Sequence, residues 1–148
     1  MTRFLVLPLT LMLLAARPAG AAEDDPFYRR AAGCVAVLER DAAALVGRYK
    51  AGERSLKPAL VKMTEQGFTF IGKAYLRGLR KAEADRLVDE AKAEQKGLSP
   101  EALAQLSAAC QAEGAKLYAS ANGLEQALVT NRAKARVDKL LARPKPAG

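Results

Sequence analysis

Residues 99–128 read SPEALAQLSAACQAEGAKLYASANGLEQAL, and this stretch decides the fold. It opens with a serine, a proline and a glutamate, which is typical of a helix cap and first turn. Proline lacks an N–H that would be unpaired there, and an acid favours the positive end of the helix dipole. Apolar or small residues then recur every three or four positions, at Leu103, Leu106, Cys110, Gly114, Leu117, Ala121, Leu124 and Leu128. This period predicts the inner face of a helix.

The dipeptide Asn122-Gly123 could end this helix, but the apolar period continues through it. We therefore expect one long C-terminal helix, straight or bent at Gly123, and a break there would give one helix more. Beyond it the stripe continues at a shifted angle, through Val129, Ala133, Val137 and Leu140. The Arg143-Pro144 pair should end the helix, because proline disfavours helical backbone in the residue before it. Residues 143–148 are expected to form a flexible basic tail.

Three shorter helices are expected before this one. The first begins at Asp25-Pro26 and ends near Gly52, the second begins at Ser55, and the third spans about residues 82–96. We find no alternating pattern that would indicate a strand and no internal repeat. The sequence therefore predicts an all-α protein: a single domain over residues 22–142, built as a small antiparallel bundle of four helices, or five if the last one breaks.

The second helix carries two neighbouring apolar stripes, so we expect it to be the most buried of the helices. Its inner stripe contains Leu56, Leu60, Met63, Gly67, Phe70, Ala74 and Gly78, and the neighbouring stripe contains Phe68, Gly72, Tyr75 and Leu79. Two interpretations of the neighbouring stripe remain open. Ordinary helix packing would bury it, which we favour, whereas aromatic walls beside small glycines could form a binding groove.

The two cysteines fall on the inner stripes of the first and the last helix, at Cys34 and Cys110. In an oxidising compartment they most simply pair with each other, and two free buried thiols are the alternative. Packed helix axes lie about 8–10 Å apart, whereas bridged Cα atoms need about 4.4–6.8 Å. We therefore expect Gly33 and Gly114 to let the two backbones approach.

The amino-terminal segment resembles a secretory signal peptide. An apolar run (FLVLPLTLMLL, residues 4–14) follows Arg3, and small residues precede an acidic start at Glu23. The run is shorter than the ~20 apolar residues that a membrane span needs. We expect residues 1–21 to be removed by cleavage after Ala21 or Ala22, and the remaining chain, which has no second long apolar segment, to be periplasmic or secreted.

The composition excludes several kinds of chemistry. The chain has no histidine, which removes the base of Ser-His and Cys-His nucleophiles and the commonest zinc, haem and copper ligand. It has no Cys-x-x-Cys motif and no glycine-rich phosphate loop. Glu113 is the carboxylate of most interest, because it lies near Cys110, but a surface role is the simpler interpretation. We therefore expect no catalytic residues, no metal site and no cofactor.

The formal net charge is +8 for the whole chain, and it is +6 (22 basic minus 16 acidic residues) without Arg3 and Arg17 of the predicted signal peptide. This positive excess favours anionic partners. Candidate contacts with an anionic envelope surface are Lys73, Arg77, Arg132, Lys134, Arg136, Lys139, Arg143 and Lys145. For Lys73 and Arg77 the simpler interpretation is a solvated helix face that pairs with the acidic third helix. Nucleic acid is not expected as a partner, since no recognition motif is present.

Two functional hypotheses follow from these observations. The first is a non-catalytic periplasmic interaction protein, of the chaperone, inhibitor, immunity or adaptor type, that binds another protein through Phe68, Gly72, Tyr75 and Leu79. The second is an envelope-associated structural protein, held electrostatically by its basic C-terminal segment. The sequence identifies no partner for either.

Overall fold

The computed structural model describes residues 25–143, and over that range it contains five α-helices and one short 3-10 turn but no strand. The helices are α1 (Pro26–Lys50), α2 (Lys57–Leu76), α3 (Lys81–Gln95), α4 (Pro100–Ala119) and α5 (Gly123–Ala142), and the 3-10 turn η2 (Arg54–Leu56) precedes α2. The all-α prediction is confirmed. The predicted signal peptide, residues 1–21, and the predicted tail beyond Arg143 lie outside the described residues.

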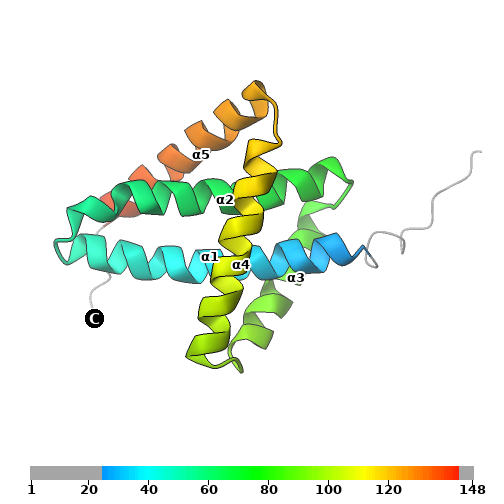
Figure 1. Cartoon of the computed structure of the whole chain (residues 1–148), viewed down its shortest axis with the longest axis horizontal. Coiled ribbons are helices and arrows are strands. Elements are labelled where there is room, and N and C mark those ends of the chain that lie inside the picture. The colour runs from blue at the N-terminus through cyan, green and yellow to red at the C-terminus, as the bar shows by residue number, and fades with distance from the viewer. Residues whose placement is uncertain (1–24, 144–148) are drawn as a thin grey trace, which may run out of the picture.

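Helices α1 and α2 lie antiparallel and side by side at the centre of the molecule, as Figure 1 shows. Helix α4 crosses both of them steeply on one face. Helix α3 packs against α1 from the opposite face, and α5 packs mainly along α2. The α1–α2 pair is therefore the middle layer, with α4 on one side and with α3 and α5 on the other.

Helix α1, and not α2, is the most enclosed helix. The five consecutive residues from Cys34 to Leu38 are all buried. Five residues exceed one helical turn, so neighbours must surround α1 on every side at this level. On α2 the buried apolar side chains are Leu60, Phe70 and Ala74. The expectation that the second helix would be the most buried is wrong, because α3 and α4 enclose α1 while one side of α2 stays open.

Helix starts follow the local signals in the sequence. The Asp25 carboxylate accepts a hydrogen bond from the Phe27 amide at 2.8 Å, and the Ser99 hydroxyl accepts one from the Ala102 amide at 3.2 Å. Hydrogen bonds from its own backbone N–H and from the Ser99 side chain hold the pKa of Glu101 below its usual value. These contacts satisfy N–H groups that have no partner within the helix.

The expected single C-terminal helix is wrong, because the chain breaks after α4 and starts again at Gly123. The Asn122 side chain accepts a hydrogen bond from the Glu125 amide at 3.0 Å, and the Glu125 carboxylate accepts one from the Asn122 amide at 3.3 Å. This reciprocal capping box nucleates α5. The new helix direction leaves Leu124 and Leu128 exposed and buries Ala133 and Val137.

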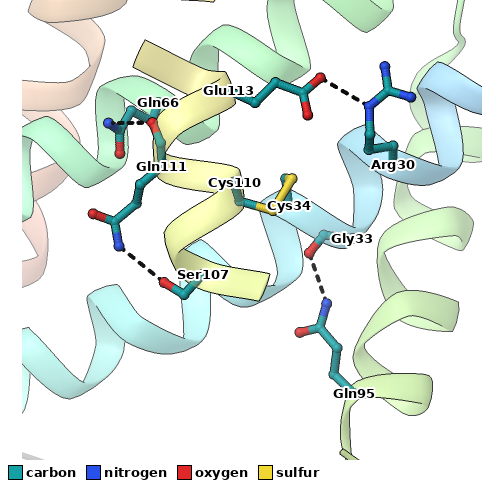
Figure 2. The surroundings of a disulfide bond; sticks show 9 residues. All are labelled: Arg30, Gly33, Cys34, Gln66, Gln95, Ser107, Cys110, Gln111 and Glu113. Atoms are coloured by element: carbon teal, nitrogen blue, oxygen red, sulfur yellow. Dashed lines mark hydrogen bonds and ion pairs between the residues drawn. A yellow bond between two sulfur atoms is a disulfide. The ribbon is translucent and has the colours of Figure 1, made fainter. Parts of the chain in front are cut away.

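The predicted disulfide joins α1 to α4, with the Cα atoms of Cys34 and Cys110 5.1 Å apart (Figure 2). The buried face of α4 consists of the small residues Ser107, Cys110 and Gly114, which allow close contact. The prediction that both glycines bring α1 and α4 together is wrong. Gly114 allows α4 to approach α2, whereas the Cβ position of Gly33 is open.

Polar contacts around the disulfide hold the three layers together. The Arg30 guanidinium pairs with Glu113 at 3.0 Å, so the carboxylate singled out in the sequence links α4 to α1. The Gln95 side chain of α3 donates a hydrogen bond to the Gly33 carbonyl at 2.8 Å, and the Gln66 amide of α2 donates one to the Gln111 carbonyl at 3.0 Å. Figure 2 shows these contacts on both sides of the bridge.

Candidate functional site

A composite depression lies on the face of the α1–α2 pair that points away from α4. It consists of three adjoining hollows: about 370 Å³ between α1, α2 and α3; about 680 Å³ between α2 and α5; and about 310 Å³ between α1, α2 and α5. The Ile71 side chain lines all three, and Phe68 lines both hollows on the α5 side. We call this depression the concave face.

The concave face has a floor and two walls. The floor comes from α1 and α2 and includes Val35, Phe68, Ile71, Gly72 and Tyr75. One wall is α3, with Asp85, Val88 and Asp89, and the other is α5, with Leu128, Val129, Arg132 and Arg136. None of its lining residues belongs to α4. The face therefore exists because α3 and α5 diverge from the same side of the α1–α2 pair.

Large apolar side chains on this face are in contact with solvent. The exposed fraction is 43% for Tyr75, 72% for Leu76 and 52% for Leu128, and Phe68 is half-buried. Apart from the backbone of α2 and the two chain neighbours, nothing lies within 4 Å of the position that a Cβ at Gly72 would occupy, so the space above this glycine is open. Contiguous exposed apolar surface of this kind marks interaction sites in soluble proteins.

The structure brings together three of the four residues predicted to form a binding surface. Phe68, Gly72 and Tyr75 line the hollow between α2 and α5. Leu79 lies beyond the end of α2, is buried in the core and borders the hollow next to α3. The expectation that packing would bury the whole stripe is wrong for Tyr75, which is exposed, and holds only in part for Phe68, which is half-buried.

Sequence reasoning missed several residues of this face. Ile71 and Leu76 lie on neither of the two stripes assigned to the second helix. Leu128 was placed on the inner side of the C-terminal helix, and the turn at Asn122 moves it to the concave face. The sequence does contain one signal for this face: Ile71 is an apolar residue that lies just outside both regular stripes of the second helix.

Two ion pairs connect the floor of the concave face to its walls. The Lys73 ammonium of α2 lies 3.3 Å from the Glu125 carboxylate of α5, and the Lys92 ammonium of α3 lies 2.8 Å from the Glu39 carboxylate of α1. Between Pro26 and Arg143, Arg132 and Arg136 make no ion pair, although both are exposed. The α5 wall therefore carries uncompensated positive charge.

The residues predicted to contact anions do not form one patch. The two in or next to α2 have internal partners: Lys73 of α2 pairs with Glu125. Arg77, which follows the last residue of α2, lies 4.0 Å from the ring centre of Phe27 and 3.6 Å from the Asp25 carboxylate. Their expected pairing with the acidic third helix is wrong, because α3 packs on α1. The Arg143 carbonyl accepts a hydrogen bond from Lys50 at 2.6 Å, and Lys145 lies outside the described residues.

A second groove, of about 690 Å³, lies between α2, α4 and α5 and borders one of the two other basic residues of α5. Lys134 lines this groove. Lys139, five residues further along α5, is exposed to solvent. The Lys57–Asp138 pair at its edge, 2.8 Å apart, raises the pKa of Lys57 through a hydrogen bond. At its base the Thr130 hydroxyl donates to Glu65 at 2.7 Å and lies 2.8 Å from the Tyr118 hydroxyl, so one polar chain joins α2, α5 and α4.

The described residues contain no group of three or more cysteine or acidic side chains that could hold a metal ion. No helix within that range is long and apolar enough to cross a membrane. Comparison of the chain with protein-family models, with curated proteins and with solved structures finds no match.

Proposed function

We propose that this protein is an exported, non-catalytic binding module of the periplasm, of the chaperone, inhibitor, immunity or adaptor type, and that the concave face is its binding surface. The signal-like residues 1–21 and the paired cysteines support export. The observation that carries the binding role is the exposed apolar surface around Tyr75, Leu76 and Leu128.

The position of the disulfide fits this role. The Cys34–Cys110 bridge and the Arg30–Glu113 pair fix α1, which belongs to the floor, against α4 behind it. The hydrogen bond from Gln95 to the Gly33 carbonyl fixes the α3 wall to the same helix. A floor that is already rigid loses little conformational entropy when a partner binds, which favours affinity. The apolar side chains lose solvent contact on binding, which contributes ~25 cal/mol per Å² of apolar area.

Site-specific photo-crosslinking in the native envelope tests the proposal. A photoreactive phenylalanine analogue is placed at Leu76 or Leu128, and a matched control carries it at Ala112, an exposed position on α4. We expect discrete protein adducts from the first two positions and none from the third. Adducts from Ala112 alone, or from none of the three positions, would reject the concave face as the binding surface.

The alternative function is envelope association through basic residues, and one observation favours it. Four exposed cations on α5, namely Arg132, Lys134, Arg136 and Lys139, have no ion-pair partner among residues 25–143. Their neutralisation to glutamine should then weaken binding to anionic vesicles at low salt, where the Debye length is ~10 Å or more. Unchanged binding of the neutralised protein would remove this alternative.

A further inference from the structure

We infer that the partner element that occupies the concave face is an amphipathic α-helix whose acidic side chains lie along the α5 wall. This inference rests on the proposed function and adds to it the chemistry of the partner. It is carried by three features of the face: its shape, its apolar floor and the uneven distribution of charge between its walls.

The shape favours an elongated protein segment. The three hollows all border Ile71 and so form a row of adjoining hollows, with α3 on one side and α5 on the other. A flat bilayer cannot reach a floor that is recessed between two helices. The apolar side chains that the floor leaves accessible are Phe68, Ile71 and Tyr75, and they suit the apolar stripe that a helix presents at positions i, i+3, i+4 and i+7.

The charges of the walls define the flanks of the partner helix. Two cations that line the concave face are neutralised by ion pairs: Lys73 pairs with Glu125, and Lys92 pairs with Glu39. Arg132 and Arg136 are the exceptions, and both line hollows of the concave face. They are four residues apart on α5, about 6 Å along the axis, so both point to one side and match acids at i and i+4 on a neighbouring helix.

The opposite wall carries the opposite charge. Asp85 and Asp89 of α3 line the hollow between α1, α2 and α3. Asp85 pairs with Lys81 of its own helix, whereas Asp89 has no ion pair among the described residues. An acidic flank is therefore attracted to the α5 wall and repelled from the α3 wall, which gives the docked helix a defined lateral position.

Three synthetic helical peptides with one shared leucine stripe test the inference. One flank carries glutamate, glutamine or lysine, and the other flank is glutamine throughout. Fluorescence anisotropy with the disulfide-bonded protein should give affinities in the order glutamate, glutamine, lysine. Exposed ion pairs contribute modestly, so we expect each step to change the dissociation constant about two- to tenfold.

Charge reversal on the α5 wall should invert this order. The double variant Arg132→Glu/Arg136→Glu should bind the lysine peptide best. The matched control Lys62→Glu/Lys116→Glu changes the net charge equally, away from the concave face, and should keep the original order. Because all four positions are exposed, circular dichroism and melting curves of both variants should match the parent.

The outcomes separate this inference from the proposed function. Equal binding of all three peptides, all weakened by Leu76→Asp, would reject the acidic flank but keep the docking face. Binding of none of them, while crosslinks from Leu76 and Leu128 persist, would reject the helical partner alone. A monomer–dimer equilibrium that Leu128→Asp abolishes would assign the face to a second copy and overturn the inference.

Discussion

Gly114 of α4 lies directly against Gln66 of α2: a Cβ atom at position 114 would be 2.8 Å from the Gln66 Cβ and 3.2 Å from the Phe70 ring. Since the first of these atoms is fixed to the α2 backbone, it cannot move aside without moving the helix. The closeness of α4 to the central layer therefore depends on the missing side chain.

The substitution Gly114→Ala should destabilise the protein. Overpacking costs about 1–3 kcal/mol, and the better helix propensity of alanine offsets about 1 kcal/mol of it. Gly47→Ala is the matched control, because Gly47 also lies inside a helix but has open space around it. Urea denaturation should show a lower free energy of unfolding for Gly114→Ala than for the parent. For Gly47→Ala the free energy of unfolding should rise by up to ~1 kcal/mol. Equal gains for both would show that α4 does not contact α2 closely.

Removal of the disulfide should lower stability without changing the helical content. The bridge joins residues 76 positions apart, and closure of such a loop contributes roughly 4 kcal/mol in the chain-entropy model. We expect Cys34→Ser/Cys110→Ser to melt well below the oxidised parent and at nearly the same temperature as the reduced parent. Two thiols that react in the unreduced native protein would contradict the pairing.

Phe68 and Phe70 should differ sharply in their contribution to stability, although they are two residues apart on α2. Phe70 is fully buried, so Phe70→Ala should cost about 3–5 kcal/mol. Phe68 is half-buried and lines the concave face, so Phe68→Ala should cost clearly less and should weaken partner binding. Chemical denaturation of both variants under one condition measures the difference. Equal losses would indicate that Phe68 is covered.

This pair of residues also shows what the sequence could and could not predict. The stripes on the second helix correctly separated Phe70 from Phe68, because both depend on the local helical period. Which stripe is covered depends on where α3 and α5 dock, and that is decided by contacts between segments far apart in the chain. The caps at Asp25 and Ser99 were predictable for the opposite reason, since each is contained within a few residues.

The break before α5 shows a conflict between two local signals. The apolar period ran through residues 117–128 and favoured one helix, whereas Asn122 and Glu125 form a capping box that only a chain break allows. The apolar period is the longer of the two signals and therefore favours the unbroken helix. The capping box prevails in the structure because it satisfies two backbone N–H donors at once, those of Asn122 and Glu125. The resulting turn places Leu128 and Arg132 on the concave face.

Loss of this cap should loosen α5 selectively. Asn122→Ala removes the acceptor for the Glu125 amide and should cost ~1 kcal/mol. Because α5 contacts mainly α2, hydrogen exchange should accelerate in the first turns of α5 and remain unchanged in α1. Asn131→Ala, at an exposed position inside α5, is the control and should leave exchange unaltered. Uniform acceleration along the whole chain would show that α5 does not open by itself.

Export predicts a defined amino terminus. Mass spectrometry of the protein from the periplasmic fraction should show a chain that begins at Ala22 or Glu23, because small residues at positions 19 and 21 suit signal peptidase. A periplasmic protein that retains Met1 would contradict cleavage. A protein found only in the cytoplasm would remove the oxidising compartment on which the pairing argument relies.

The bridge between α1 and α4 also determines how the molecule would respond to mechanical force. A chain pulled from its two ends transmits tension through the Cys34–Cys110 bond, so α2 and α3, which lie within the bridged loop, carry no load. Only the segments outside the loop, α5 among them, can be drawn out. The 76-position separation corresponds to about 250 Å of extended chain that stays hidden until the bond is reduced. In an optical trap, a reducing buffer should therefore add one extension step of that length to the force curve.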